Sequence, residues 1–164
     1  MTPGQVAKLV DTHAAALMLC ARQWCSEPED VVQEAFVKLV RQRSPPTDAV
    51  AWLYRVVRNG AIDAGKTARR RQRRESSVAR PERWFVECDI DGLDAETAVA
   101  ALAQLADEER EVIVAKLWGG LSFEQIGSVV GCSASTAFRR YTAGVEVLRK
   151  QLGIATCQDH SSNV

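Results

Sequence analysis

The stretch LSFEQIGSVVGCSASTAFRRYTAGVEVLRKQL, from Leu121 to Leu152, indicates the fold of the C-terminal half of the chain. Ser122 precedes Gln125 by three residues, which is the spacing of a capping box and predicts the start of a short helix. Gly131 suits the end of that helix, and Ser133 suits the N-cap of a longer one. A short helix, a glycine-containing turn and a longer basic helix are the layout of a helix-turn-helix, whose second helix enters the major groove of DNA.

The N-terminal part of the longer helix carries side chains that can read DNA. Arginine bridges O6 and N7 of guanine, hydroxyl groups reach phosphates or bases, and a phenyl ring packs on the methyl group of thymine. The positions predicted to be exposed there are Ser135, Thr136, Phe138, Arg139 and Thr142. Two alternatives stay open: Arg139 and Arg140 lie in solvent or pair with acidic residues, and Phe138 packs against its neighbours.

A second informative tract, DVVQEAFVKLV (Asp30–Val40), lies upstream and is followed by WLYRVVRNGAID (Trp52–Asp63). Apolar residues recur there with helical periodicity, and no stretch of the chain shows the sustained alternation of a strand. The predicted buried stripes include Val10 in a first helix and Val40 in a second. The expected helices run from about Gln5 to Trp24, from an N-cap at Ser26 to near Arg43, and from Thr47 or Asp48 to about Glu75.

The pattern between the two tracts predicts the domain organisation. Residues 76–93 mix serine, proline, glycine and charge without periodicity, which favours a flexible linker. A helix is expected over residues 94–105, and another, capped by Asp107, ends at Gly119-Gly120. The sequence therefore predicts an all-α fold of two small helical domains, residues 1–75 and 94–152, joined by a flexible linker. The second domain is the helix-turn-helix, and residues 153–164 form a polar tail.

The formal net charge of zero conceals a strong segregation of charge. Residues 66–84 hold eight basic and two acidic side chains, a balance of +6, whereas residues 87–111 hold nine acidic side chains and one arginine, a balance of −8. Such blocks lie in solvent or against a polyelectrolyte, because like charges resist close packing. The basic block suits a phosphate backbone. The acidic block either shields the basic one, keeps the second half off DNA until something displaces it, or forms a solvated face.

The same sequence argues against several classes of protein. The five cysteines form no CxxC pair, and no apolar run is long enough for a signal peptide or a membrane span, so we expect a cytoplasmic protein with reduced thiols and no membrane insertion. His13 and His160 are isolated, and no carboxylate pair, nucleophile motif or phosphate-binding loop is present. The sequence therefore predicts a protein that is not an enzyme and that has no cofactor and no metal site.

Four pieces of the sequence stand in the order that a known family shows: DVVQEAFVKL, AWLYRVVRN followed by an aspartate, LSFEQIGSVVGCS and VLRKQL. Over Val6–Arg74 and Ala95–Leu152 the chain resembles an extracytoplasmic-function sigma factor of bacterial RNA polymerase. That family keeps two conserved regions, called two and four, joined by a linker. The resemblance implies a sigma factor that directs the polymerase core to specific promoters and assists DNA opening. It also implies an anti-sigma partner or another control input.

The resemblance assigns roles to particular positions. The loop Arg43–Ala51 corresponds to the one that captures a base flipped from the −10 element. The chain departs from the commonest pattern at Phe138, where a lysine or arginine is usual, at Arg139, where serine is frequent, and at Ala106, where proline is common. The implied contacts are Asp30, Gln33 and Glu34 with the polymerase clamp helices; Trp52, Arg55, Arg58, Asn59, Lys66, Arg69 and Arg70 with the −10 element; and Lys116, Ser135, Thr136, Phe138, Arg139, Arg140 and Thr142 with the −35 element.

Several assignments keep alternatives. Trp52 and Tyr54 either stack on bases or belong to the core, and the polar residues of Asp30–Glu34 also suit an ordinary exposed helix face. For the whole chain, one alternative is a stand-alone helix-turn-helix regulator that binds operators without polymerase, which leaves Asp30–Asp63 without a purpose. Another is an RNA-binding adaptor that uses the arginine run.

Overall fold

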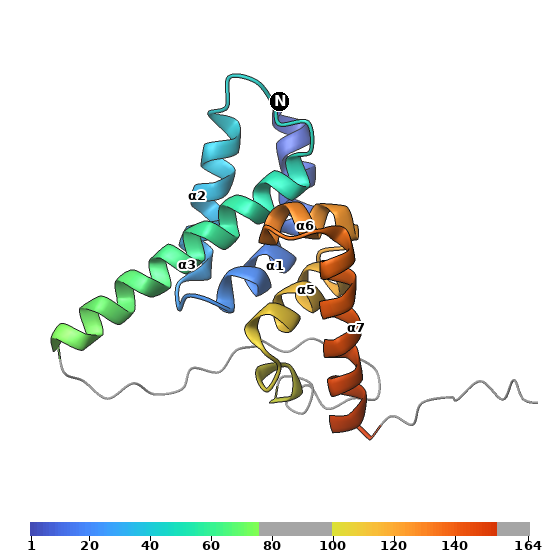
Figure 1. Cartoon of the computed structure of the whole chain (residues 1–164). Coiled ribbons are helices and arrows are strands. Elements are labelled where there is room, and N and C mark those ends of the chain that lie inside the picture. Colours follow the sequence, from blue (N-terminus) through green and yellow to red (C-terminus); the bar gives the residue numbers. More distant parts are fainter. Residues whose placement is uncertain (76–99, 154–164) are drawn as a thin grey trace, which may run out of the picture.

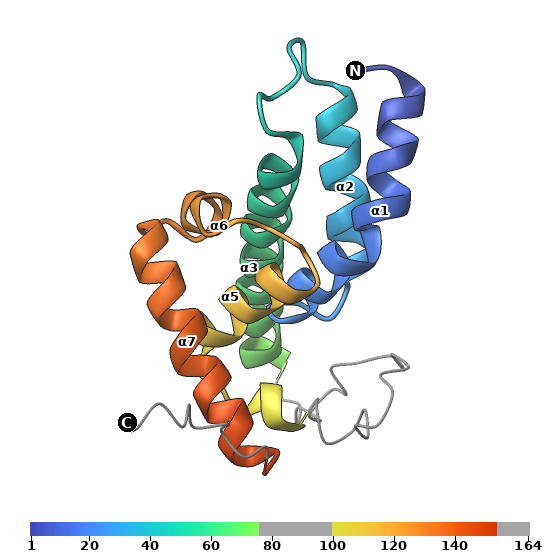
Figure 2. The ribbon, with the colours of Figure 1, turned by 90° about the vertical axis from the view of Figure 1, so that its right-hand side faces the viewer.

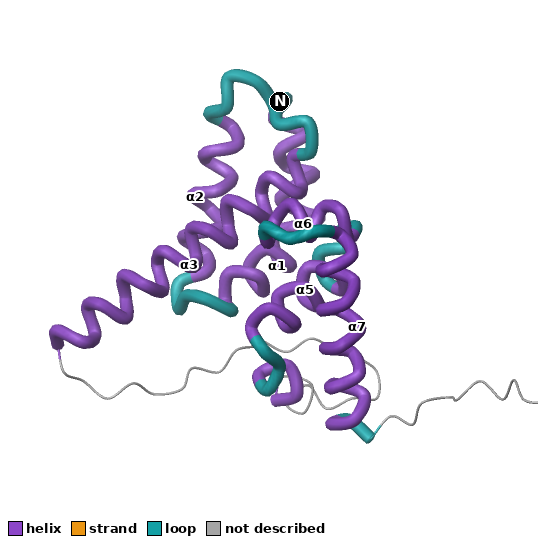
Figure 3. Tube along the Cα trace, viewed as in Figure 1, coloured by secondary structure: helices purple, strands orange, loops and turns teal. Residues whose placement is uncertain are grey.

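The structure, a computed structural model, describes residues 1–75 and 100–153, and this part of the chain is helical without any strand (Figures 1 and 3). The all-α prediction is confirmed. The predicted linker and most of the polar tail lie outside the described residues. The helices are α1 (Pro3–Arg22), α2 (Pro28–Val40), α3 (Ala49–Glu75), α5 (Asp107–Leu117), α6 (Phe123–Val130) and α7 (Ala134–Gln151), and residues 100–103 form one more helical turn.

The helices α1, α2 and α3 pack against one another and form the N-terminal half (Figure 2). Leu17, Leu39 and Leu53 are almost completely buried where they meet. Asp48 stands immediately before α3, and its Oδ1 accepts a hydrogen bond of 2.9 Å from the backbone N–H of Ala51, which caps the helix. The third helix continues to Glu75 as predicted, without a break at its internal glycines.

The helices α5, α6 and α7 form the C-terminal half. Gly144 lets α7 cross α5 closely, because a Cβ atom at that position would lie 2.6 Å from Cδ1 of Ile113. Ser122 and Gln125 form the predicted capping box of α6, Gly131 ends that helix with a left-handed φ of 79°, and Ser133 caps α7. The helix-turn-helix layout is therefore present as the sequence predicted.

Two predicted caps are wrong. The second helix begins at Pro28, with Glu27 and not Ser26 at the N-cap, because proline favours the first helical position and fixes where the helix starts. Asp107 is the first residue of α5, and Ala106 is its N-cap. Asp107 still lies at the positive end of the helix dipole, where its charge is favourable.

The two halves share one hydrophobic core. Tyr54 and Val57 of α3 belong to the same buried cluster as Val112 of α5, Leu121 of the following loop and Ile126 of α6. The helix α6 packs on α3, and α5 packs on α1, as Figure 1 shows. The helix-turn-helix thus lies against the N-terminal half in this structure, a contact that the sequence prediction of two helical domains did not include.

Candidate nucleic-acid and polymerase interfaces

The first turns of α2 present the predicted polar face. Asp30, Gln33 and Glu34 are all exposed, while Val32 and Ala35 on the opposite side of the helix are buried. Glu34 forms an ion pair with Lys38 one turn later, with 2.9 Å between Oε1 and Nζ. The spacing of three and four residues therefore places the predicted polar residues together on one accessible surface.

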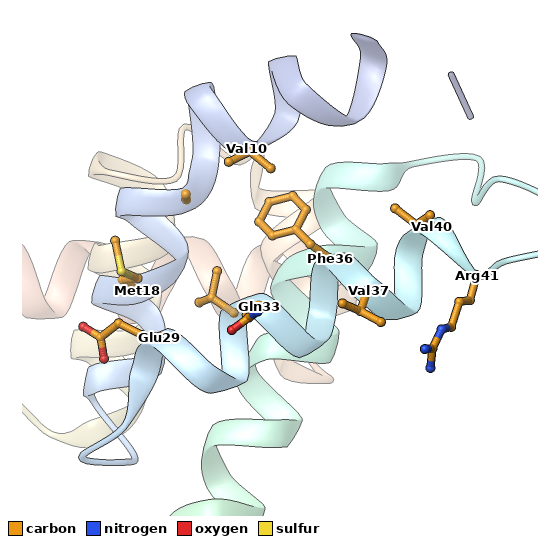
Figure 4. Close-up of a pocket in the computed structure, with 10 residues that line it drawn as sticks. Val10, Met18, Glu29, Gln33, Phe36, Val37, Val40 and Arg41 are labelled. Atoms are coloured by element: carbon orange, nitrogen blue, oxygen red, sulfur yellow. The ribbon is translucent and has the colours of Figure 1, made fainter. Parts of the chain in front are cut away.

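An apolar groove adjoins this polar face, between α1 and α2 (Figure 4). Its volume is about 490 Å³, and Gln33 and Glu29 lie at its polar edge. Val10 and Val40 were predicted to be buried, but they are 37% and 60% exposed. Periodicity identifies an apolar face and does not tell what covers it, so the sequence analysis missed this groove. Its lining includes Val10, Ala14, Met18, Val32, Phe36 and Val37.

The arginines at the middle of α3 form hydrogen bonds and an ion pair with residues of the C-terminal half. Arg58 makes a two-pronged ion pair with Glu111 of α5, in which Nε donates to Oε1 and Nη2 donates to Oε2 at 3.1 Å. The side chains of Arg58 and Glu111 are 21% and 6% exposed. Arg55 is exposed, and its Nη2 donates to Oγ of Ser128 on α6 at 2.5 Å.

The aromatic residues of α3 face the core. Tyr54 is completely buried, so its predicted alternative role in stacking on bases does not fit the structure. Burial raises the pKa of its hydroxyl group, with a smaller contribution from the nearby Cys20. Trp52 is half-buried and packs against the same core.

The C-terminal part of α3 is an exposed basic arm. Lys66, Arg69 and Arg70 are exposed, and this end of the helix projects away from the other helices in Figure 1. Asn59, nearer the middle of the helix, is exposed as well. Oδ1 of Asp63 lies 4.0 Å from Nζ of Lys66, one turn apart.

The N-terminal part of α7 leaves only some of its predicted reading residues open. Ser135, Phe138, Arg139 and Thr142 are exposed, whereas Thr136 and Arg140 are half-buried. Arg140 instead pairs with Glu108 of α5 at 2.5 Å, which was the alternative considered from the sequence. The hydroxyl of Thr136 lies 2.9 Å from that of Ser133. The hydroxyl of Thr142 donates to the carbonyl oxygen of Phe138 at 3.0 Å.

Phe123, at the start of α6, connects several of these residues and was missed by the sequence analysis. Its ring lies 5.3 Å from that of Phe138 and 5.6 Å from that of Tyr141, both edge to face. Nζ of Lys116 lies 4.9 Å from the centre of the same ring and donates a hydrogen bond of 3.0 Å to the carbonyl oxygen of Leu121. The sequence offered one signal for this cluster, namely that both helices of the helix-turn-helix carry aromatic residues.

A third polar contact joins the halves at the predicted base-capturing loop. Oδ2 of Asp48 accepts a hydrogen bond of 2.8 Å from Nε2 of Gln125 on α6. This bond, together with that from the backbone of Ala51, lowers the pKa of the Asp48 carboxyl group. The loop is therefore attached to the helix-turn-helix in this structure.

Across residues 1–75 and 100–153, no three potential metal ligands come together, and no helix is long and apolar enough to cross a membrane. The exposed surfaces are suited to binding nucleic acid and protein. They combine an exposed cationic helix, a polar helix face beside an apolar groove, and a helix-turn-helix with an open reading face. These features define a helical protein of the DNA-binding class.

The comparisons with known proteins identify the family. The models of Sigma-70 region 2 and Sigma-70 region 4 match residues 8–75 and 95–148. The chain is 33% identical over 158 residues to the ECF RNA polymerase sigma factor SigL of Mycobacterium tuberculosis, with 89% of each chain covered. It is 32% identical over 133 residues to the RNA polymerase sigma factor CarQ of Myxococcus xanthus, with 76% of this chain and 74% of CarQ covered.

A solved structure supports the same fold. The sigma factor RpoE from Bartonella quintana, in complex with the anti-sigma factor NepR, matches with a TM-score of 0.78 at 20% identity, over 93% of this chain and 99% of that one. The chain therefore belongs to the extracytoplasmic-function sigma factors of the sigma-70 family, which direct RNA polymerase to promoters. The match to region 2 also accounts for residues 8–75, which a stand-alone helix-turn-helix regulator would leave unexplained.

Proposed function

We propose that three surfaces of this chain carry the three binding functions of a sigma factor. The polar face of α2 and the adjoining groove bind the polymerase core. The α3 helix holds the opened strand of the −10 element. The face of α7 formed by Ser135, Phe138 and Arg139 reads the −35 element in duplex DNA. The observation that carries this proposal is the match to both sigma regions, over helices that expose these surfaces.

The polymerase surface rests on the groove between α1 and α2. Exposed Val37 and Val40 beside Asp30, Gln33 and Glu34 combine apolar area with charge. Stable interfaces have this anatomy, with an apolar centre and a polar rim that selects the partner. A helical partner with apolar and basic side chains fits both parts of the surface.

The strand-binding surface rests on charge. Lys66, Arg69 and Arg70 are exposed along one arm, where they can contact successive phosphates of a single strand. Arg55, Arg58 and Asn59 extend the same surface toward the loop that ends at Ala51, and half-buried Trp52 lies at its start. Contacts of this kind strengthen binding uniformly and weaken with salt, so sequence preference must come from other residues.

The upstream surface is narrower than the sequence predicted. Arg139 is exposed and can bridge a guanine, whereas Arg140 is paired with Glu108. Lys116 is half-buried over Phe123 and sits where a phosphate contact is expected. We therefore expect Arg139→Ala to weaken binding by about 1–3 kcal/mol and to relax preference at one base pair, with a smaller effect for Arg140→Ala.

No step of this role requires the chain itself to catalyse a reaction. Core polymerase holds both regions, so each weak DNA contact gains from a high effective concentration, and free protein binds promoters poorly. We place this function in the cytoplasm, where the polymerase acts.

Because the similar structure from Bartonella quintana is that of a sigma factor bound by an anti-sigma factor, we also propose an anti-sigma partner for this chain.

Run-off transcription with bacterial core polymerase that lacks its own sigma factor tests the proposal, using a library of promoter fragments. The wild-type chain should initiate from a subset of fragments that share two sequence elements. Charge reversal at Asp30 and Glu34 should abolish core binding and initiation while the helical circular dichroism is retained. Asp11→Lys, at an exposed site of α1, is the control for added positive charge and should remain active. Tight binding to a palindromic operator without core, and no initiation with it, would refute the sigma role.

A further inference from the structure

The −35 reading face contains an exposed aromatic ring that the fold holds in place. Phe138 is 56% exposed, although it belongs to a helix with a well-packed opposite side. Its ring meets the edge of Phe123 at an interplanar angle of 90°. Phe123 is itself half-buried and also contacts Tyr141, so the exposed ring rests on a fixed support.

The chemistry of this ring limits what it can recognise. A phenyl group offers no hydrogen-bond donor or strong acceptor, so it cannot read the polar edge of a base. Ser135 is exposed and precedes exposed Phe138 by three residues and exposed Arg139 by four, so it is the neighbour of both on the surface of α7. In the major groove the distinctive apolar group is the C5-methyl of thymine.

We infer that Phe138, supported by Phe123 as a positioning residue, selects a base pair of the −35 element by packing on the C5-methyl group of a thymine. The inference rests on the proposed −35 role of α7. It assigns a methyl-bearing pyrimidine to a position where the usual lysine or arginine of the family would favour a different base. Phe123 acts only through Phe138 and needs no contact with DNA.

Deoxyuridine substitution tests the inference, because it removes the methyl group and leaves base pairing unchanged. The −35 sequence is first selected from a promoter library with wild-type holoenzyme, and each thymine is then replaced by deoxyuridine. At one position the substitution should weaken promoter binding about fourfold, the factor that corresponds to about 0.8 kcal/mol for one buried carbon. At the same position, 5-methylcytosine paired with guanine should bind better than cytosine.

Variants assign the effect to the two rings. In Phe138→Ala, thymine and deoxyuridine should bind equally at that position, while the other positions keep their preferences. Phe123→Ala should reduce the methyl effect, and Phe123→Leu should restore part of it, which a loss of folding would not do. Equal binding of thymine and deoxyuridine by wild-type holoenzyme overturns the inference, as does a selected element without thymine. Failure of wild-type holoenzyme to initiate anywhere overturns the proposed function as well.

A separate set of contacts supports a second inference, on the strand-binding surface. Arg58 is ion-paired with Glu111, Arg55 donates a hydrogen bond to Ser128, and Gln125 donates one to Asp48. Each of these contacts joins the C-terminal half to α3 or to the loop that precedes it. A guanidinium group whose Nε and Nη2 donate to the Glu111 carboxylate cannot offer the same two-pronged edge to a phosphate. Gly119 allows the close fit, because a Cβ atom there would lie 2.8 Å from the hydroxyl oxygen of Tyr54.

We infer that the free chain adopts a closed state, in which region four covers the part of the strand-binding surface formed by Arg55 and Arg58, and the Glu111 carboxylate occupies the place of a phosphate at Arg58. Like the first inference, it rests on the proposed roles of the surfaces. The test measures binding of the full-length chain, without polymerase, to a single-stranded −10 oligonucleotide by fluorescence anisotropy. Variants are placed in the C-terminal half, outside the residues assigned to DNA.

Glu111→Gln should raise the affinity for the oligonucleotide about tenfold and increase the radius of gyration in X-ray scattering. Gln125→Ala combined with Ser128→Ala should act in the same direction, and it changes only partly exposed or exposed side chains. Because the Gln125 side chain also completes the capping box of α6, retention of the helical circular dichroism is the folding control for this variant. With core polymerase present, all variants should initiate as the wild type does. Unchanged affinity and unchanged dimensions in both variants overturn the closed state, whereas the proposed function is tested independently by the transcription of the wild type.

Discussion

Two glycines inside α3 make a matched pair of substitutions with opposite expected results. A Cβ atom at Gly65 would lie 2.1 Å from the carbonyl oxygen of Trp24, at the end of α1. A Cβ atom at Gly60 would meet only Cγ1 of Val31, at 3.2 Å. Both positions are interior to the same helix. The higher helix propensity of alanine should therefore stabilise the folded state by about the same amount at each, roughly 1 kcal/mol.

The difference between the two variants therefore comes from packing. At Gly65 a backbone atom must move by roughly an ångström, and overpacking of this kind costs about 1–3 kcal/mol. At Gly60 a side-chain methyl group has to give by only a few tenths of an ångström. We expect Gly60→Ala to be neutral or stabilising by up to about 1 kcal/mol, and Gly65→Ala to be less stable than Gly60→Ala by about 1–3 kcal/mol.

The assay is urea unfolding of the full chain followed by circular dichroism at 222 nm, with calorimetry of the same samples. For a chain of this size, 1 kcal/mol corresponds to about 2–4 °C in Tm. A Gly65→Ala variant as stable as Gly60→Ala would refute the close approach of α1 to α3. An unchanged m-value in both variants is the control that the unfolding reaction itself has not changed.

Three further outcomes can be measured on the same protein. Gly131→Ala should lower the free energy of unfolding by about 1–2 kcal/mol, because Gly131 has a φ of 79°, and Gly4→Ala, at an exposed site with nothing within 4 Å, should not. Ser122→Ala should lower Tm through the loss of a cap worth about 1 kcal/mol, and an unchanged Tm would contradict the capping box. Burial raises the pKa of Cys20 to about 12, so at pH 8 its thiol stays protonated, and iodoacetamide should alkylate half-buried Cys132 long before Cys20 in peptide mapping by mass spectrometry; equal rates would show that Cys20 is accessible.

The parts of the fold that could be predicted from the sequence depend on neighbours in the chain. The capping box of Ser122 and Gln125 and the left-handed turn at Gly131 involve residues within four positions of one another. Where two local preferences compete, the sequence is less decisive. Ser26 is the better N-cap by residue type, yet Pro28 sets the start of α2, and the helix has no side-chain cap.

The candidate site was only partly predictable, because its geometry is set by contacts between distant residues. Arg58 and Glu111 are 53 positions apart, and each alone reads as an ordinary charged helix residue. The exposed positions of Arg69 and Arg139 follow from helical periodicity, whereas the pairing of Arg140 with Glu108 depends on how α7 crosses α5. Phe123 likewise gains its position from packing against Phe138, which no local pattern indicates.

The contacts of the closed state also indicate which interactions polymerase has to replace when it separates the two halves. Moving Arg58 from the Glu111 carboxylate to a phosphate exchanges one anion for another, and ion pairs of this kind contribute little beyond the cost of removing them from water. The preference for the closed state must then come chiefly from apolar contacts, such as those of Tyr54 with the cluster that contains Leu121 and Ile126.

The helix α2 packs on α1 and α3 and takes little part in the contact between the halves (Figure 2). Its polar face and the groove therefore stay accessible while the halves are together. Polymerase can therefore dock on the closed chain first and separate the halves afterwards. Binding to core should accordingly be a two-step process in stopped-flow measurements. Its first step should be unaffected by Glu111→Gln and its second step should be accelerated; a slower or single step would show that opening has to come before docking.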